Sequence, residues 1–318
     1  MPSRTESELS GLLRIAVAAT IWGSIPVLVR AVDASAFVIV FWRVLLASLV
    51  LAAYLAVRGR LAEVASLPRS RKLALVGMGA LLAFNWILFF TALQLTQVAT
   101  AVLLGYLGPV FVAVLTPLFT REPFDRRVVL PLAVALAGTV VIVNPAQISV
   151  RSTAEVAGAA AAFVSAITYA LLVLNAKRLV QGIPATVYML VEYTTASVLL
   201  LPFALTMKSP STLAEWGSLG ALGIVNTALT GFLFLSALRH VRADHAAILT
   251  YAEPASAVVF AAVFLGEALT PTTIAGGIAI AGAGMLVSRM RAGASVEGPP
   301  VVLAEEPAPE SDEPAHKR

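Results

Sequence analysis

Runs of about 20 apolar residues, separated by short clusters of charge, recur along the whole of this chain. Apolar residues make up 59% of the sequence and charged residues 13%, whereas a water-soluble domain carries about a quarter of its residues charged. A bilayer core accepts only helices or closed barrels, because each backbone amide needs a partner there. The alternating ten-residue strands of a barrel are absent, so the sequence predicts a helical membrane protein.

Ten spans are predicted from the apolar windows between charges and prolines. They lie at 12–31, 36–57, 72–92, 98–119, 128–144, 156–178, 184–207, 216–238, 244–265 and 270–290. The first span has no small-residue cleavage signature and is followed at once by a second span. We therefore expect it to be retained and not removed as a signal peptide.

Lysine and arginine fall mainly on one side of the predicted membrane. With the N-terminus inside, the internal segments hold 16 of them and the external segments three, namely Arg30, Arg151 and Lys208. Cytoplasmic loops retain positive charge, so we predict a multi-pass protein of the cytoplasmic (plasma) membrane with both termini cytoplasmic. Because these residues spread over many loops, no nucleic-acid partner is expected. Residues 292–318, rich in Pro, Glu and Ala, are predicted to form a disordered cytoplasmic tail.

An internal repeat is found when the chain is compared with itself at an offset of 145 residues. Residues 91–122 align with 236–267 without a gap, with nine identities in 32 positions. The identities that apolar composition alone would not produce are Tyr106 with Tyr251, Pro109 with Pro254 and Glu122 with Glu267. The first and sixth spans align more weakly at an offset of 147, which pairs Trp22 with Tyr169 and Arg30 with Lys177. The chain is therefore predicted to be a duplication, with repeats over 12–144 and 156–290.

Each repeat holds five spans, an odd number, so the second repeat crosses the membrane in the opposite sense to the first. Inverted repeats place a pseudo-two-fold axis in the membrane plane and a binding site near the midplane between the halves, which suits alternating access. The predicted fold class is an all-α integral membrane protein of ten transmembrane helices, built as two inverted five-helix repeats. Transport is the function that this geometry favours.

Four stretches carry a family resemblance. They are AEPASAVVFAAVFLGEALTPTTIAGGIAIAGAG at 252–284, LGPVFVAVLTPLFTREPF at 107–124, ATIWGSIPVLVR at 19–30 and FWRVLLASLVL at 41–51. The first two resemble the paired EamA signature of the drug/metabolite transporter superfamily, and the others resemble that family's first two helices. The resemblance implies a basket of spans one to four and six to nine around a central cavity, flanked by spans five and ten, and export of amino acids or related metabolites. Arg121 departs from the family pattern, which has glycine there.

Two charged residues on equivalent spans are predicted to face each other. Arg43 lies seven residues inside the second span, where a lone Arg costs on the order of 3 kcal/mol unless it faces protein or water. Glu192 on the seventh span is its expected partner, because their depths differ by only roughly 8 Å. Two interpretations stay open: a structural ion pair, or an Arg43 that meets a substrate carboxylate while Glu192 meets an amine or a proton.

Glu253 and Pro254 lie about 14 Å into the ninth span, close to the midplane. We expect Glu253 to be a functional carboxylate; the alternative is a structural bond to a neighbouring backbone or tyrosine. Pro254 and Pro109 each remove a backbone donor and are expected to kink their helices against protein or a wet cavity. Tyr106 and Tyr251, three residues before the prolines, either line that cavity or fill it.

The remaining candidates are uncharged or lie at a membrane boundary. An aromatic cavity with a few amides is predicted from Trp22, Asn85, Trp86, Tyr169 and Asn226. His245 with Asp244 begins the ninth span, where proton coupling and a polar helix start are the alternatives. Glu122 and Glu267, at opposite faces, are predicted to be boundary or turn residues.

Other functional classes lack their sequence marks. There is no H-E-x-x-H helix, no Gly-rich phosphate loop with Lys and no G-x-S-x-G turn, so no enzyme, cofactor or metal site is predicted. Zero cysteines exclude disulfides and thiolate metal sites. We predict a secondary transporter of small polar metabolites in the lipid bilayer, acting as an amino-acid or metabolite exporter, monomeric or homodimeric. Broad drug efflux is the alternative within this class, and a channel or membrane enzyme lies outside it.

Overall fold

The computed structural model describes residues 4–144 and 152–290. Ten helical stretches in this part are long and apolar enough to cross a membrane. Their bounds are Ser7–Arg30, Ala36–Val57, Arg69–Leu95, Val98–Phe119, Arg126–Val143, Thr153–Leu179, Ala185–Thr206, Leu213–Ala237, Ala243–Leu265 and Pro271–Arg289. The prediction of an all-α membrane protein with ten spans is confirmed. The tail predicted at 292–318 lies outside the described residues.

Six spans are built on one uninterrupted α-helix. These helices are α3 (Ala36–Val57), α5 (Arg69–Leu95), α8 (Val129–Val143), α9 (Thr153–Leu179), α10 (Ala185–Thr206) and α15 (Pro271–Arg289). A 3-10 turn, η1 (Arg126–Val128), leads into α8, and the short α4 (Ala62–Ser66) connects α3 to α5. Side-chain oxygens of Ser35, Ser152 and Thr270 accept backbone amides at the starts of α3, α9 and α15. These caps satisfy amides that have no partner within the helix.

Four spans are interrupted near their middle. The segments are α1 (Arg4–Trp22) and α2 (Ile25–Arg30); α6 (Val98–Gly105) and α7 (Gly108–Phe119); α11 (Leu213–Gly223), the π-helical η3 (Ile224–Leu229) and α12 (Thr230–Ala237); and α13 (Ala243–Thr250) and α14 (Ala252–Leu265). The helices α6 and α13 end four residues before Pro109 and Pro254. A proline removes the bond that the carbonyl four residues earlier would accept, so both breaks fall where helix continuity is weakest.

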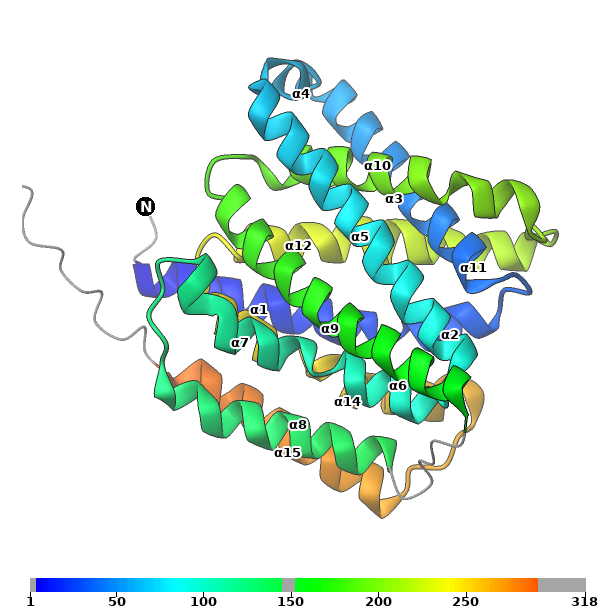
Figure 1. The fold of residues 1–318 in the computed structure, drawn as a ribbon. Helices are drawn as coiled ribbons and strands as arrows, with labels where there is room; N and C mark the ends of the chain where they lie inside the picture. Colours follow the sequence, from blue (N-terminus) through cyan, green and yellow to red (C-terminus); the bar gives the residue numbers. More distant parts are fainter. Residues whose placement is uncertain (1–3, 145–151, 291–318) are drawn as a thin grey trace, which may run out of the picture.

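The fifth and tenth spans stand beside the rest of the bundle. Figure 1 shows α8 and α15 side by side at one edge of the molecule, and they are in close contact. Gly138 and Gly276 permit this approach, because a Cβ on either residue would lie within 2.7 Å of the other's carbonyl oxygen. Among the other helices, α9 packs against α5 and α7, and α1 packs in the same way against α12 and α14.

Equivalent residues of the two repeats meet at the centre of the bundle. The Tyr251 hydroxyl donates to the Tyr106 carbonyl at 2.6 Å, and the centroids of their rings lie 6.0 Å apart. These two residues are aligned by the sequence repeat, and in an inverted repeat aligned residues come together near the pseudo-two-fold axis. The axis therefore passes close to Tyr106 and Tyr251, and the inverted-repeat prediction is confirmed.

A second set of equivalent bonds joins the first helix of each repeat to the third helix of the other. The bonds run from Asn85 Nδ2 to Ser165 O and Thr168 Oγ1 (2.7 and 2.8 Å), and from Asn226 Nδ2 to Ile21 O and Ser24 Oγ (both 2.9 Å). The corresponding acceptors are 144 residues apart in the sequence. The weaker alignment, which pairs Trp22 with Tyr169, is therefore displaced by three residues. In the structure both repeats use one buried amide as a clamp between their neighbours.

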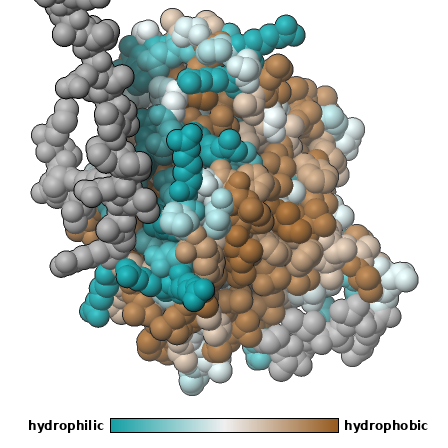
Figure 2. Space-filling model, turned by 60° about the vertical axis from the view of Figure 1, so that its left-hand side comes forward, coloured by the Kyte–Doolittle hydropathy of each residue, from teal (hydrophilic) through white to brown (hydrophobic). Residues whose placement is uncertain are grey.

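The two ends of the bundle differ in polarity. We call the end that holds the start of α1 and the end of α15 the terminal face, and the other end the opposite face. Figure 2 turns the terminal face forward and shows hydrophilic side chains gathered there, beside a broad hydrophobic surface. A bundle embedded in lipid has such a surface, because its sides face hydrocarbon and its ends face water.

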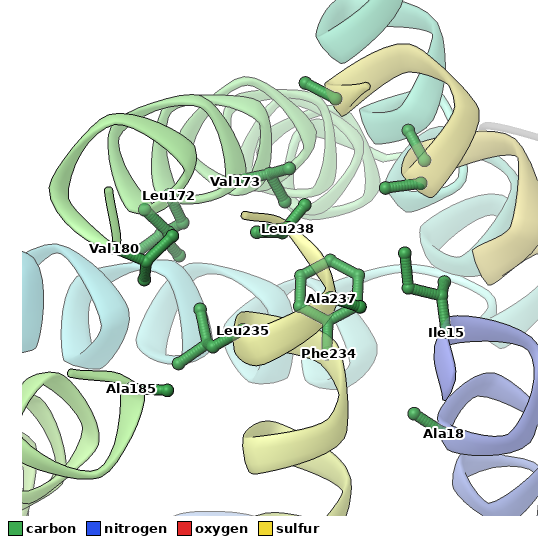
Figure 3. Close-up of a cluster of buried hydrophobic side chains, with 14 of the residues drawn as sticks. Ile15, Ala18, Leu172, Val173, Val180, Ala185, Phe234, Leu235, Ala237 and Leu238 are labelled. Atoms are coloured by element: carbon green, nitrogen blue, oxygen red, sulfur yellow. The ribbon is translucent and has the colours of Figure 1, made fainter. Parts of the chain in front are cut away.

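A buried apolar cluster closes the half of the bundle next to the terminal face (Figure 3). Its labelled members are Ile15, Ala18, Leu172, Val173, Val180, Ala185, Phe234, Leu235, Ala237 and Leu238, from α1, α9, α10, α12 and the turns that follow α9 and α12. Toward the opposite face, the buried clusters of the described chain are smaller, with four residues around Ile39 and three alanines between α5, α6 and α9. The bundle is more tightly packed near the terminal face.

Candidate functional site

Arg43 lies in the first half of α3 and is held by both repeats. Its Nε donates to Thr227 Oγ1 at 2.9 Å, and its Nη2 donates to the Asn226 carbonyl at 3.4 Å. Its Cζ lies 5.5 Å from the centroid of the Trp86 ring, in a cation–π contact. A guanidinium within a membrane span requires such partners, because a lone charge there is costly. The position of Arg43 is therefore fixed by α5 and η3.

The π-helical η3 supplies the oxygen acceptors for Arg43. A π-helical turn displaces the backbone bonding pattern, and such turns occur frequently at functional sites. The Asn226 carbonyl in this turn accepts from Trp22 Nε1 at 3.2 Å as well as from Arg43, and Trp22 Nε1 is shared with Thr230 Oγ1 at 2.8 Å. Trp22 is the last residue of α1. Through η3, Arg43 is thus connected to the break between α1 and α2.

Glu253 begins the first turn of α14, next to the break in the ninth span. It interacts electrostatically with Arg43, yet among the ion pairs of the described residues none joins the two. Tyr106 and Tyr169 lie within the same electrostatic range of Glu253. A Cβ on Gly23 of the first span would lie 2.9 Å from the Glu253 carbonyl oxygen, so this turn is packed tightly against the break in that span. Glu253 and Arg43 therefore both lie beside the break in the first span and form no ion pair with each other.

Glu192 does not form the predicted ion pair with Arg43. It is only 6% exposed on α10, and one carboxylate oxygen accepts the Tyr188 hydroxyl at 3.2 Å. The two charges lie on packed helices but have different partners: Arg43 donates to η3, and the Glu192 carboxylate accepts from Tyr188 of its own helix. Tyr193 lies within electrostatic range of both. The acidic residue in range of Arg43 is Glu253.

His245 and Asp244 lie at the start of α13, near the terminal face. The Asp244 carboxylate is 1% exposed and accepts from Arg242 Nε at 3.0 Å and Nη2 at 2.7 Å. His245 is equally buried, and neither ring nitrogen has a hydrogen-bond partner among the described residues. Two turns of helix, about 12 Å, separate His245 from Glu253. The structure therefore places this pair apart from the Arg43 and Glu253 site.

Some of the other predicted residues hold the helices together and do not line the candidate site. Asn85 and Asn226 are fully engaged in the clamps, and Tyr251 is buried on the axis. Thr227 accepts a hydrogen bond from Arg43, and Tyr193 interacts with it electrostatically; neither was predicted as a site residue. Neither residue carries a charge or belongs to the repeated motif, so the available signal was position alone: each follows a residue that was predicted.

Comparison with known proteins shows the relatives of this chain. The model of the EamA-like transporter family matches residues 9–144 and 156–289. The pseudopaline exporter CntI of Pseudomonas aeruginosa is 31% identical over 224 residues, covering 68% of this chain and 74% of the relative. The uncharacterized inner membrane transporter YicL of Salmonella typhimurium is 27% identical over 302 residues, covering 89% and 96%. The uncharacterized transporter YxxF of Bacillus subtilis is 25% identical over 263 residues, covering 82% and 84%.

A solved crystal structure shares the fold. It superimposes with a TM-score of 0.77 at 22% sequence identity, covering 90% of this chain and 98% of the solved chain. At this identity the similarity shows the arrangement of the helices alone.

Proposed function

This chain belongs to the EamA-like transporter family, and on that basis we propose that it is a secondary transporter that exports amino acids or similar zwitterionic metabolites by alternating access. The observation that carries the proposal is the pair Arg43 and Glu253: opposite charges from different repeats that both lie beside the break in the first span, with no ion pair between them in the described residues. Two charges already in an ion pair would satisfy each other. Held apart, Arg43 is free to bind a substrate carboxylate and Glu253 a substrate amine.

The burial of the site residues supports a cavity between the repeats. Arg43, Trp86, Tyr106, Tyr169 and Glu253 come from the middle of their spans and are nevertheless half-buried. Their contacts are with other helices of the bundle, so we assign their exposed surface to an internal, water-accessible space. Aromatic walls with a few convergent polar groups are usual for small-molecule sites.

The orientation follows from charge. The terminal face carries most of the basic loop residues, and cytoplasmic loops retain such residues, so we assign the terminal face to the cytoplasm. The relative YicL is described as an inner membrane transporter, which fits the same location for this chain. Buried His245, beside Asp244, is our candidate for coupling export to proton entry.

Counterflow in proteoliposomes tests the proposal. Vesicles preloaded with an unlabelled amino-acid mixture are given labelled amino acids or ethidium, and the wild type is compared with Arg43→Gln, Glu253→Gln and the surface control Arg60→Gln. We expect saturable amino-acid exchange that is lost in the first two variants and kept in Arg60→Gln. Ethidium movement without amino-acid exchange would make the protein a drug exporter. Normal exchange by both site variants would make their charges structural.

A further inference from the structure

Two ion pairs lie at corresponding helix ends of the inverted repeats, one at each face, with their cations one helical turn out of the register of the amide clamps. Lys177 Nζ lies 3.2 Å from Glu122 Oε1 at the terminal face, and Arg30 Nη1 lies 2.6 Å from Glu267 Oε1 at the opposite face. The carboxylates follow α7 and α14 and are aligned by the sequence repeat. The cations belong to the last turns of α9 and α2. Each pair therefore ties the first span of one repeat to the fourth span of the other.

The two pairs have different surroundings. The side chains of Lys177 and Glu122 are 11% and 20% exposed, whereas those of Arg30 and Glu267 are 63% and 50% exposed. Lys177 Nζ also donates to the Val241 carbonyl at 2.6 Å, and Glu122 Oε2 accepts the Ala243 amide at 3.1 Å. The terminal pair thus locks α7 and α9 to the start of α13. An ion pair as exposed as the one at the opposite face contributes little to stability.

The apolar packing next to the two ion pairs also differs, and it is again more extensive at the terminal face. Ala92, Ala101 and Ala162 form the small buried cluster toward the opposite face, and their repeat counterparts are Ala237, Ala246 and Ala18. All six alanines are fully buried. Toward the terminal face, however, the equivalent three belong to the much larger apolar cluster of Figure 3. The same scaffold is therefore locked and sealed at one face and held by a surface contact at the other.

We propose that Lys177–Glu122 and Arg30–Glu267 are the alternating gates of this transporter. The inference rests on the proposed function, because a gate presupposes alternating access. In an inverted-repeat transporter the opposite state arises when the repeats exchange conformations. The exchange buries the Arg30–Glu267 pair at the opposite face and leaves Lys177–Glu122 as the exposed pair at an open terminal face.

Cysteine accessibility without any substrate tests the gates. The chain contains no cysteine, so Ala18→Cys and its counterpart Ala162→Cys each give a single reporter without background. Each reporter is placed in nanodiscs, combined with Lys177→Gln or with the matched Arg30→Gln, and labelled with a hydrophilic fluorescent maleimide. Lys177→Gln is expected to raise the labelling rate at Ala18→Cys about tenfold, since a charge-assisted bond biases the two states on that order, and to leave labelling at the fully buried Ala162→Cys slow. Arg30→Gln is expected to change either rate less than twofold.

A charge reversal separates gating from folding. Glu122→Lys combined with Lys177→Glu restores an ion pair but not the bonds to Val241 and Ala243, and it is expected to slow labelling at Ala18→Cys relative to Lys177→Gln without reaching the wild-type rate. If Lys177→Gln does not yield folded protein, Glu122→Gln, which keeps an acceptor for the Ala243 amide, replaces it. Unchanged labelling in a folded variant, or equal increases at both reporters, overturns the gates. Because the labelling assay contains no substrate, a failure of amino-acid counterflow would not contradict the proposed gates. Unchanged labelling, in turn, would not contradict the proposed substrate site.

Discussion

The two repeats share a skeleton and differ in what they place at its centre. Asn85 and Asn226 make the same pair of clamp bonds, yet the helices around Asn85 are continuous, while those around Asn226 are broken in the first span and π-helical in the eighth. At the position where the second repeat has Glu253, the first has Gly108, which lies against the Tyr169 ring. The shared parts are the clamps between neighbouring helices, and the parts that differ surround the proposed site.

The largest expected effect comes from a methyl group at one of two central breaks of the first repeat, the break at Gly23 or the break at Gly108. A Cβ on Gly23 would lie 2.6 Å from the Ala257 amide nitrogen and 2.9 Å from the Glu253 carbonyl oxygen, whereas a Cβ on Gly108 would meet only the side chain of Tyr169, at 2.6 Å. Backbone atoms move aside less easily than an aromatic side chain, so the clash at Gly23 is the more costly one. Gly23→Ala is expected to lower the free energy of unfolding by about 3 kcal/mol and Gly108→Ala by about 1 kcal/mol. Denaturant unfolding in micelles measures both; equal losses would contradict the comparison.

The amide clamps give the next effect. Asn226→Leu and Asn85→Leu each remove two buried hydrogen bonds, so each is expected to lower the free energy of unfolding by about 2 kcal/mol. Only Asn226→Leu also disturbs the turn that holds Arg43. Counterflow normalised to folded protein is therefore expected to be lost in Asn226→Leu and kept in Asn85→Leu. Equal transport by the two variants would show that the breaks around Asn226 have no special role.

A smaller effect is expected from the bond between Thr227 and Arg43. Thr227→Val removes the oxygen that accepts from Nε, and we expect counterflow to fall about tenfold because Arg43 loses its orientation. Thr227→Ser keeps the oxygen and is the matched control. Recovery by serine, with unchanged thermal stability in both variants, is the measurement that distinguishes positioning from packing; similar counterflow in valine and serine variants would exclude it.

The smallest effect is expected at the surface contact between the repeats. Lys208 and Asp33 form an exposed ion pair near the opposite face, with side-chain exposures of 63% and 82%. Lys208→Gln is expected to change the free energy of unfolding by less than about 0.5 kcal/mol and to leave counterflow unchanged. A clear loss of transport would mean that exposed contacts between the repeats control the cycle as strongly as the buried ones.

More of the fold than of the candidate site could be predicted from the sequence. The ten spans follow from hydropathy, and the inversion follows from an odd number of spans with Tyr106, Pro109 and Glu122 repeated in register. The direct ion pair expected between Arg43 and Glu192 is absent from the described residues, because depth along a helix says nothing about the direction in which a side chain turns. The π-helical turn at Ile224–Leu229 has no mark in its composition, so Thr227 was not recognised. Tertiary packing decides both points.

The contact between Gly138 and Gly276 has a consequence for the order in which the protein is built. Its two halves lie 138 residues apart, so the groove on α8 has no native partner until the last span has entered the membrane. Arg43 likewise has no oxygen acceptor until η3 has been synthesised, because η3 follows Arg43 by more than 180 residues. Such long-range contacts form late. Synthesis of the first repeat alone therefore leaves an unpaired helix edge and a guanidinium without its oxygen acceptors, and completion of the second repeat is the step that commits the chain to its native bundle.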